Sequence, residues 1–300
     1  MEQNTQISTA GKYKQMAQLV EQLLGMLVYS SVFISCCAFS LTIETYKLAG
    51  LPISLTMAVF VFLATLFTYN LSSVYSFIRR PHQQKYKERQ EWWLRNKKAL
   101  AIVGTGSIIV AIGIYFFYGL SINLWIMLHL AVISIGYTVP VIYKSNKVRP
   151  LRSIPLLKVF LIAYVWAVVT VGFPLLDAEG VAWDMPVLLL LLRRFLFILA
   201  LALLFDIRDY TYDRSKNTLT IPGLIGVRYT KVVSLVLLAA YGWLSVASET
   251  GGVQSALLAS AIIAGMVVAF SDENRPRVYY ALLADGAMLV HAGLVYLAFS

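Results

Sequence analysis

Three aspartates at the end of a long apolar run form the most distinctive chemical pattern in the chain. Asp206, Asp209 and Asp213 are spaced three and four residues apart, directly after the run Val187–Phe205. In a helix this spacing places all three carboxylates on one face. Like charges on one face repel, so the pattern is favourable where a cation neutralises it. Carboxylate oxygens suit Mg²⁺ that is shared with a substrate phosphate.

The same stretch has a second interpretation, a solvated helix end at a membrane surface. Arg208 and Arg214 lie among the aspartates and would then form ordinary salt bridges with them. Exposed ion pairs of this kind contribute little energy and need no metal. The surrounding chain has to separate the two interpretations.

The composition is that of a membrane protein. Of 300 residues, 59% are hydrophobic and 13% are charged, with a mean hydropathy of +0.72. A soluble domain has about 45–50% apolar and about 25% charged residues. The long apolar runs predict helices rather than barrel strands. The net charge of +10 is therefore expected to reflect loops beside anionic lipid, not nucleic-acid binding.

Nine apolar runs predict an all-α, polytopic membrane protein that forms one domain over residues 1–300. Each run is close to the roughly 20 residues that span a bilayer. The runs lie near Leu23–Leu41, Ile53–Tyr69, Ala99–Tyr118, Ile122–Val141, Ile154–Leu175, Val187–Phe205, Val232–Ser248, Gln254–Phe270 and Val278–Phe299.

The distribution of basic residues predicts the orientation. With the N-terminus inside, the inner segments hold 22 of the 25 Lys and Arg residues, a strong positive-inside bias. Segment 1–21 is then a polar, cytoplasmic N-terminus, segment 71–98 a cytoplasmic basic loop and segment 206–229 a cytoplasmic Asp-rich loop. Glu44 and Lys47 fall in an outer loop. The chain is expected to be a multi-pass protein of the inner membrane.

Several charged or polar residues fall inside the apolar runs. Arg193 and Arg194 are expected to snorkel outward or to pair within the bundle. Asp285 is expected to line a polar cavity or to pair with a basic group. His129 and His291 are predicted to be hydrogen-bonded packing residues, since no close His/Cys set supports a zinc or haem site.

Two inner basic loops have two possible roles. Arg79 and Arg80 follow the second apolar run, and Lys144 follows the fourth. Such residues commonly anchor a protein under lipid headgroups. They could instead face a pyrophosphate. No Gly-rich phosphate-binding loop occurs in the chain.

The stretch that begins at Asp206 resembles the second aspartate-rich motif of the UbiA family of intramembrane prenyltransferases. The likeness includes Asp206–Asp209, Asp213 with Arg214, the step Thr220–Pro222 and then Gly226. Tyr137–Pro140 before a basic loop is similar as well. Asn217 stands where the family often has glycine. The nine-helix plan is also like that of the family, which implies a bundle with a central cavity open to the cytoplasmic side.

The resemblance implies a Mg²⁺-dependent transfer of an isoprenyl group from a prenyl pyrophosphate to an aromatic or lipid-soluble acceptor. In this family two aspartate-rich motifs hold Mg²⁺, which grips the pyrophosphate while an allylic cation forms in a dry cavity. Asp206, Asp209 and Asp213 would then be the catalytic, metal-binding residues. The pyrophosphate would be bound by Asn70, Arg79, Arg80, Lys144, Arg208 and Arg214.

The first aspartate-rich motif is degenerate. Asn70 matches the family pattern, but Val74 and Ile78 stand where aspartates are expected. No carboxylate occurs between Glu44 and Glu88. Apolar side chains cannot coordinate Mg²⁺, so half of the expected carboxylate cage is missing.

Three functions are therefore compatible with the sequence. The first is a divergent prenyltransferase that uses the aspartate triad, and it accounts best for the triad and the inner basic loops. The second is a non-catalytic membrane protein of the same fold with a binding or scaffold role. The third is a transporter that uses Asp285 and the intramembrane arginines. Because function resides in the site, the fold alone does not choose among them.

Overall fold

The computed structural model describes residues 25–79, 87–139, 142–144, 147–149, 151, 154, 156–178, 180–215 and 218–299. These residues form an all-helical bundle with one small hairpin, β1 (Ile142–Lys144) paired antiparallel with β2 (Lys147–Arg149). The first half of the bundle contains α2 (Val32–Leu48), α3 (Leu55–Arg79), α4 (Lys87–Phe117), α5 (Leu124–Thr138), α6 (Leu157–Ala167), the π-helix η3 (Val168–Gly172) and α7 (Phe173–Asp177). The second half contains α8 (Met185–Ser215), α9 (Ile221–Ser248), α10 (Gly251–Ala269), α11 (Arg277–Tyr279), the π-helix η4 (Tyr280–Ala284) and α12 (Gly286–Ala298).

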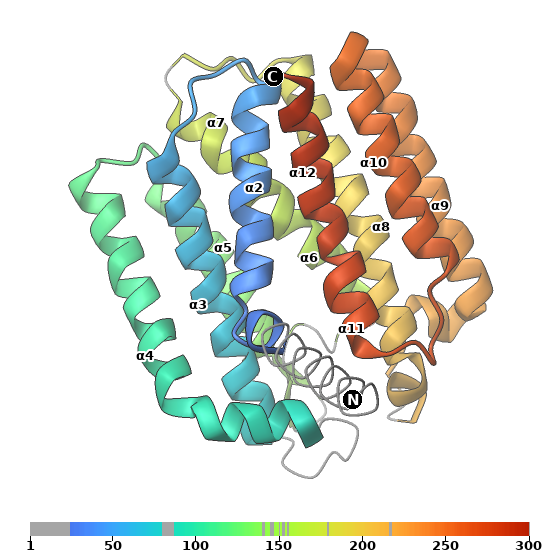
Figure 1. Cartoon of the computed structure of the whole chain (residues 1–300). Coiled ribbons are helices and arrows are strands. Elements are labelled where there is room, and N and C mark those ends of the chain that lie inside the picture. Colours follow the sequence, from blue (N-terminus) through green and yellow to red (C-terminus); the bar gives the residue numbers. More distant parts are fainter. Residues whose placement is uncertain are drawn as a thin grey trace, which may run out of the picture.

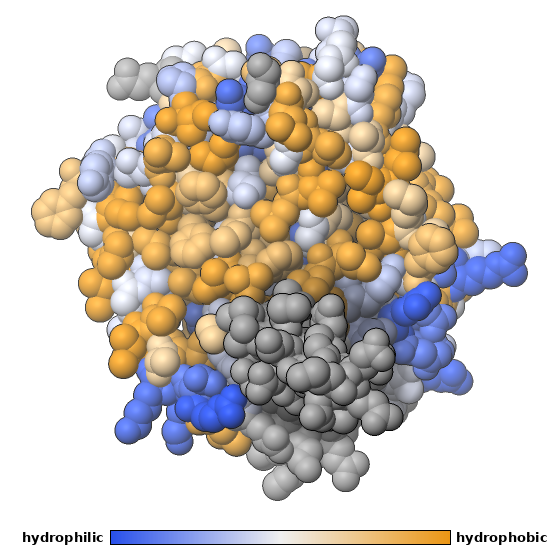
Figure 2. All heavy atoms as spheres, in the orientation of Figure 1, coloured by the Kyte–Doolittle hydropathy of each residue, from blue (hydrophilic) through white to orange (hydrophobic). Residues whose placement is uncertain are grey.

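The long helices stand side by side and alternate in direction (Figure 1). In the described part of the chain, seven helical segments are long and apolar enough to cross a membrane. The shorter apolar helices α2 and α5 stand among them. The all-helical membrane architecture predicted from the sequence is confirmed. A broad apolar band crosses the face seen in Figure 2, and hydrophilic residues gather at its lower end.

Helix α8 is central to the packing. It contacts α6 on one side and α9 on the other, while α12 packs between α2 and α10. A continuous stretch of α8 from Phe197 to Leu204 is buried. Such burial on every side is typical of a helix in the middle of a large bundle. This position allows α8 to bring its polar residues against several other helices.

The first predicted span is wrong in its boundaries. The helix begins after a turn at Ser31, which has a positive φ of 66°, and it continues to Leu48 rather than ending near Leu41. Glu44, predicted to lie in an outer loop, is inside this helix and only 1% exposed. The prediction failed because a charged residue inside a run was read as the end of that run.

Two segments that were predicted as loops are largely helical. Helix α3 extends to Arg79 and α4 starts at Lys87, so most of segment 71–98 continues these two helices. Likewise, α8 extends to Ser215 and α9 starts at Ile221 within segment 206–229. The aspartate triad therefore lies on a regular helix and not in a loop.

The fifth predicted span changes its helical period at a proline. Pro174 has no N–H to donate, so the carbonyl of Thr170 loses its α-helical partner. The backbone there forms η3, and the Thr45 hydroxyl of α2 donates to the Thr170 carbonyl at 2.7 Å. Irregular backbone at membrane depth needs such a substitute partner. This hydrogen bond ties the fifth span to the first.

Candidate functional site

The aspartate triad lies at the C-terminal end of α8, on the face that the spacing predicted. Asp206 is almost fully buried, with 2% of its surface exposed, whereas Asp209 and Asp213 are partly buried. The depth of burial thus falls toward the end of the helix. A buried carboxylate is stable in its charged form only when it is paired. Asp206 therefore needs a partner.

The partner of Asp206 is Lys158, in the first turn of α6. The Lys158 Nζ atom lies 2.6 Å from Asp206 Oδ1 and donates a hydrogen bond to it. The lysine side chain keeps 21% of its surface exposed. Lys158 is one of the 22 basic residues that the sequence assigned to the inner segments, and this role was not predicted. The available signal was a lone lysine at the start of an apolar span, where an unpaired charge is costly.

Asp209 is paired with its own neighbour on α8. Arg208 donates to both carboxylate oxygens of Asp209, from Nε at 2.9 Å and from Nη2 at 2.8 Å. The guanidinium also lies 5.0 Å from the centre of the Phe205 ring. Arg214 lies exposed in the last turn of α8, where its charge complements the helix dipole.

No hydrogen bond or ion pair of the described residues links Asn70 to the triad. Asn70 is 3% exposed and packs against Gly104 of α4. Its amide nitrogen is buried and has no hydrogen-bond partner among the described residues. The side chains of Arg79 and Lys144, and all of Arg80, lie outside the described residues. Their predicted contacts with pyrophosphate stay predictions.

The interior next to the triad contains polar and aromatic groups. The Trp166 indole Nε1 of α6 donates to the Tyr69 hydroxyl of α3 at 3.3 Å. The carboxylate of Asp285 interacts electrostatically with Arg208 and with Tyr69. Among the described residues, Asp285 forms no ion pair at contact distance, and its role as a polar lining residue stays a prediction.

The step Thr220–Pro222 and Gly226 has a local structural explanation. The Thr220 hydroxyl caps α9 by accepting the backbone N–H of Gly223 at 3.3 Å. Pro222 occupies the first turn, where a missing N–H costs nothing. Gly226 has a φ of 83°, so the chain kinks there in a conformation that favours glycine. Together these residues turn the chain sharply after the triad.

The arrangement of carboxylates does not fit a carboxylate-held metal ion. Within the described part of the chain, no group of three or more His, Cys, Asp or Glu residues could hold a metal. Asp206 is neutralised by Lys158, and Asp209 by Arg208. Helix α3 has no carboxylate to contribute from the opposite side.

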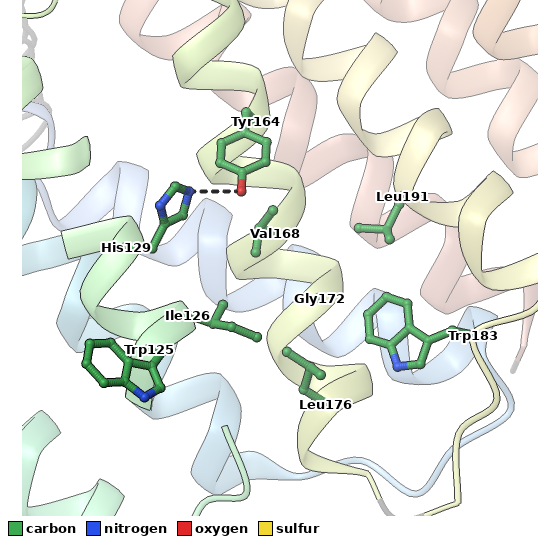
Figure 3. Close-up of a pocket in the computed structure, with 9 residues that line it drawn as sticks. All are labelled: Trp125, Ile126, His129, Tyr164, Val168, Gly172, Leu176, Trp183 and Leu191. Atoms are coloured by element: carbon green, nitrogen blue, oxygen red, sulfur yellow. Dashed lines mark hydrogen bonds between the residues drawn. The ribbon is translucent and has the colours of Figure 1, made fainter. Parts of the chain in front are cut away.

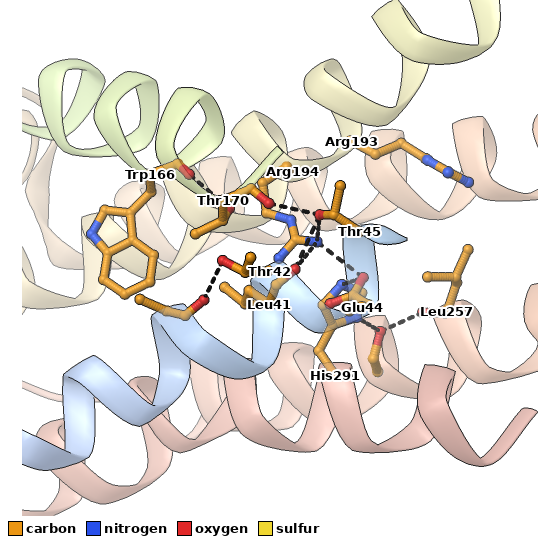
Figure 4. Close-up of polar contacts among 12 residues, drawn as sticks. Leu41, Thr42, Glu44, Thr45, Trp166, Thr170, Arg193, Arg194, Leu257 and His291 are labelled. Carbon is orange, nitrogen blue, oxygen red and sulfur yellow. Dashed lines mark hydrogen bonds and ion pairs between the residues drawn. The ribbon is translucent and has the colours of Figure 1, made fainter. Parts of the chain in front are cut away.

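A second polar cluster lies about twelve residues earlier in α8, around Arg194 (Figure 4). Arg194 Nη2 lies 3.1 Å from Glu44 Oε1, and His291 Nε2 lies 3.0 Å from the same oxygen. His291 also hydrogen-bonds Ser260 at 2.9 Å. Arg193 pairs separately with Glu249 at 2.7 Å. Pairing within the bundle, one of the two predicted alternatives for these arginines, is thus confirmed.

The predicted hydrogen bonds of both histidines are also confirmed, but only His291 is buried in the packing, whereas His129 is exposed. His291 stacks on Phe197 with ring centres 4.6 Å apart, in addition to its polar contacts. His129 Nε2 lies 3.2 Å from the hydroxyl of Tyr164.

Three solved structures share the fold of this chain. A UbiA homologue from Aeropyrum pernix K1 has a TM-score of 0.58 at 17% identity, covering 89% of this chain and 99% of its own. A UbiA homologue from Archaeoglobus fulgidus, bound to GPP and Mg²⁺, has a TM-score of 0.59 at 11% identity, covering 90% and 99%. A digeranylgeranylglyceryl phosphate synthase has a TM-score of 0.51 at 16% identity, covering 92% and 97%.

Comparison with known sequences finds no relative of this chain. No family model matches the chain, and no curated protein matches it by sequence. The structural likeness extends over about nine-tenths of the chain in each case. The chain therefore has the fold of the UbiA homologues, as the resemblance of its aspartate triad implied.

Proposed function

We propose that this protein is a divergent prenyltransferase, which transfers an isoprenyl group from a prenyl pyrophosphate to a lipid-soluble acceptor. The observation that carries the proposal is the buried Asp206–Lys158 ion pair at one end of α8. It occurs in a chain with the fold of a UbiA homologue bound to GPP and Mg²⁺. Buried charges beside a polar interior are typical of functional sites in membrane proteins.

The reaction requires stabilisation of the charges that develop on the pyrophosphate and on the allylic cation, and it requires exclusion of water. The carbon–oxygen bond of the donor breaks, its electron pair leaves with the pyrophosphate, and the acceptor attacks the carbon and loses a proton. Aromatic groups such as Tyr69 and Trp166 could stabilise the allylic cation. The surrounding apolar helices exclude water that would otherwise capture the cation.

The charge balance at the triad limits how pyrophosphate can bind. Lys158 and Arg208 are each neutralised by an aspartate, so neither provides an unopposed positive charge. Further cationic charge has to come from Arg214 and from the predicted ligands Arg79, Arg80 and Lys144. The positive-inside bias supports a site that faces the cytoplasm, with the N-terminus on the same side.

A non-catalytic binding protein is the second candidate. The specific observation in its favour is that α3 has no carboxylate, while Lys158 already neutralises Asp206. Loss of one charge-stabilising group commonly lowers a rate by about 10²–10³. Such a protein could retain a pyrophosphate lipid without cleaving it.

Transfer and binding should be measured separately in membranes that contain the protein. Labelled farnesyl and longer prenyl pyrophosphates are supplied with a mixture of aromatic acceptors, with and without Mg²⁺. We expect transfer, and we expect Asp206→Asn and Asp213→Asn to abolish it. Asp177→Asn is a matched control, because Asp177 lies at the opposite end of the bundle, where it accepts the Ser121 N–H.

The outcomes separate the two candidates. Transfer that survives both Asp206→Asn and Asp213→Asn would show that the triad is not the site. Saturable binding of the pyrophosphates without any transfer would favour the non-catalytic protein. A lack of both binding and transfer would contradict both candidates. A rate that rises with Mg²⁺ would show that the reaction uses the metal together with the pyrophosphate.

A further inference from the structure

A groove with a volume of about 550 Å³ lies on the side of the bundle, between α5 and α8 (Figure 3). Its floor is one stripe of the fifth span, made by Tyr164, Val168, Gly172 and Leu176. These residues recur every fourth position, so they share one face of the helix. The groove is distinct from the triad, because Lys158 lies six residues before Tyr164 on α6 and is directed into the bundle toward Asp206.

The walls explain why the groove stays open. Trp125 and His129 of α5 form one wall, and Leu191 of α8 forms the other. Gly172 has no side chain to fill the space between them. Trp183 closes the end away from His129, as Figure 3 shows.

The groove faces lipid. Its floor belongs to the candidate membrane span Leu157–Asp177, and Leu191 belongs to the candidate span Met185–Ser215. The Trp125 side chain is 77% exposed, and the rings of Trp125 and Trp183 suit the boundary between hydrocarbon and headgroups. A groove on such a surface is filled by a lipid or by another membrane helix.

One polar pair interrupts the apolar lining. His129 and Tyr164 point toward each other, with 3.2 Å between Nε2 and the hydroxyl oxygen (Figure 3). Both side chains are exposed to the groove. The other imidazole nitrogen, Nδ1, has no hydrogen-bond partner in the described part of the chain. A polar group that faces hydrocarbon without a partner is costly, so the site favours an occupant that supplies one.

The depth of His129 and Tyr164 in the membrane restricts which lipid heads can reach them. Tyr164 lies seven residues from the start of α6 and thirteen from the end of α7, roughly 10 Å and 20 Å along the axis. Phospholipid headgroups stay outside the roughly 30 Å hydrocarbon core. A head that reaches this depth has to be small and without charge.

We propose that the groove binds a single-chain lipid whose head is one small hydrogen-bonding oxygen group, a hydroxyl or a ring carbonyl. The head contacts His129 and the hydroxyl of Tyr164. The chain follows Val168 and Gly172 along the floor toward Trp125 and Trp183. The proposal does not depend on the prenyltransferase activity.

Tryptophan quenching by brominated phosphatidylcholine in nanodiscs tests this site. The full-length protein carries Trp243→Phe, which removes a strongly lipid-exposed tryptophan from α9. Quenching of Trp125 and Trp183 then shows that acyl chains of the phospholipid occupy the groove. We expect geranylgeraniol, a single-chain alcohol, to relieve this quenching. Squalane, a branched hydrocarbon without a head, should relieve it at least tenfold less effectively at equal concentration.

Three variants locate the effect. His129→Leu should remove the preference for geranylgeraniol over squalane, and Tyr164→Phe should reduce it about fivefold. Val168→Phe should fill the floor and abolish relief by either compound. Val236→Phe, which adds the same ring to a lipid-facing position of α9, should leave relief unchanged.

Three results would overturn the proposal. Equal relief by geranylgeraniol and squalane would show that the groove does not recognise a head. Relief that persists in Val168→Phe would show that the lipid binds elsewhere. Cross-linking between cysteines placed at Trp125 of two copies would show that a second chain covers the groove instead. Circular dichroism shows whether a variant has failed to fold. In that case the comparison of geranylgeraniol with squalane on the Trp243→Phe protein still tests the proposal.

Discussion

Helix α8 carries two clusters of buried charge, and they differ in how completely they are closed. Arg194 and Glu44 form an ion pair in which each side chain is 1% exposed. The Asp206 side chain, twelve residues farther along, is 3% exposed, but the side chain of its partner Lys158 is 21% exposed. The clusters are roughly 18 Å apart along the helix. A closed cluster can only hold the bundle together, whereas a cluster with one accessible partner can also exchange that partner for a ligand.

The closed cluster joins four helices. Arg194 of α8 and His291 of α12 both contact Glu44 of α2, and His291 reaches Ser260 of α10. The aromatic rings of Phe197 and Tyr241 cover the histidine. This arrangement gives no support to a transporter that uses the intramembrane arginines, because Arg193 and Arg194 are both buried and each is paired with a glutamate.

Breaking the closed pair should have the largest effect. Arg194→Met leaves the Glu44 carboxylate buried without its strongest counter-charge, at an expected cost of about 3–5 kcal/mol in the free energy of unfolding. The melting temperature in detergent measures the loss. The double variant Glu44→Gln/Arg194→Met should recover much of it, because no lone charge remains. A single variant that melts like the wild type would show that the pair does not hold the bundle.

Breaking the Lys158–Asp206 pair, the open pair, should reduce the stability less and ligand binding more. Lys158→Met leaves the Asp206 carboxylate without its partner, but this partner is itself 21% exposed, so we expect a loss of about 2–3 kcal/mol in the free energy of unfolding. Binding of farnesyl pyrophosphate should fall at least tenfold. Lys158→Arg keeps the charge and should retain most of the stability. If Lys158→Met loses stability but binds the pyrophosphate normally, the open cluster is structural like the closed one.

The sequence predicted the architecture because each helix is determined by residues close together in the chain. Hydropathy over about twenty residues identifies a span, and the spacing of Asp206, Asp209 and Asp213 determines that they share a face. The partners of these charges were not predictable in the same way. Lys158 and Asp206 are 48 positions apart, and Arg194 and Glu44 are 150 apart. Only the folded bundle brings them together, because α8 packs against α6 and the Arg194 side chain reaches α2.

The failed boundary at Glu44 has the same origin. A carboxylate in an apolar run predicts the end of a span when it is considered alone, because an unpaired charge in a membrane is costly. Once Arg194 is known to face it, the cost disappears and the helix continues to Leu48. Intramembrane charges of opposite sign should therefore be considered as candidate pairs before they are assigned to loops.

A smaller effect is expected where α2 meets the fifth span, close to the closed cluster. Thr45 donates to the Thr170 carbonyl, which Pro174 leaves without a partner. Thr45→Val keeps the shape but removes this donor, at an expected cost of about 1 kcal/mol. Thr42→Val is a matched control, since the Thr42 hydroxyl bonds only within its own helix, to Ala38. Equal melting temperatures for the two variants would show that the link between helices adds no stability.

The smallest effect on stability is expected at the open end of α8. Arg214 is exposed in the last turn, so Arg214→Gln should leave the melting temperature unchanged. If the open end binds an anion, the same change should weaken farnesyl pyrophosphate binding about threefold, because one positive charge is lost near the site. Lys47→Gln is the matched control, since Lys47 occupies the last turn of α2 at the opposite end of the bundle. Equal weakening by both variants would mean that the pyrophosphate responds to the overall charge and not to this site. A melting temperature that falls without any change in binding would place Arg214 with the residues that hold the bundle together, and the contrast between the two ends of α8 would then be lost.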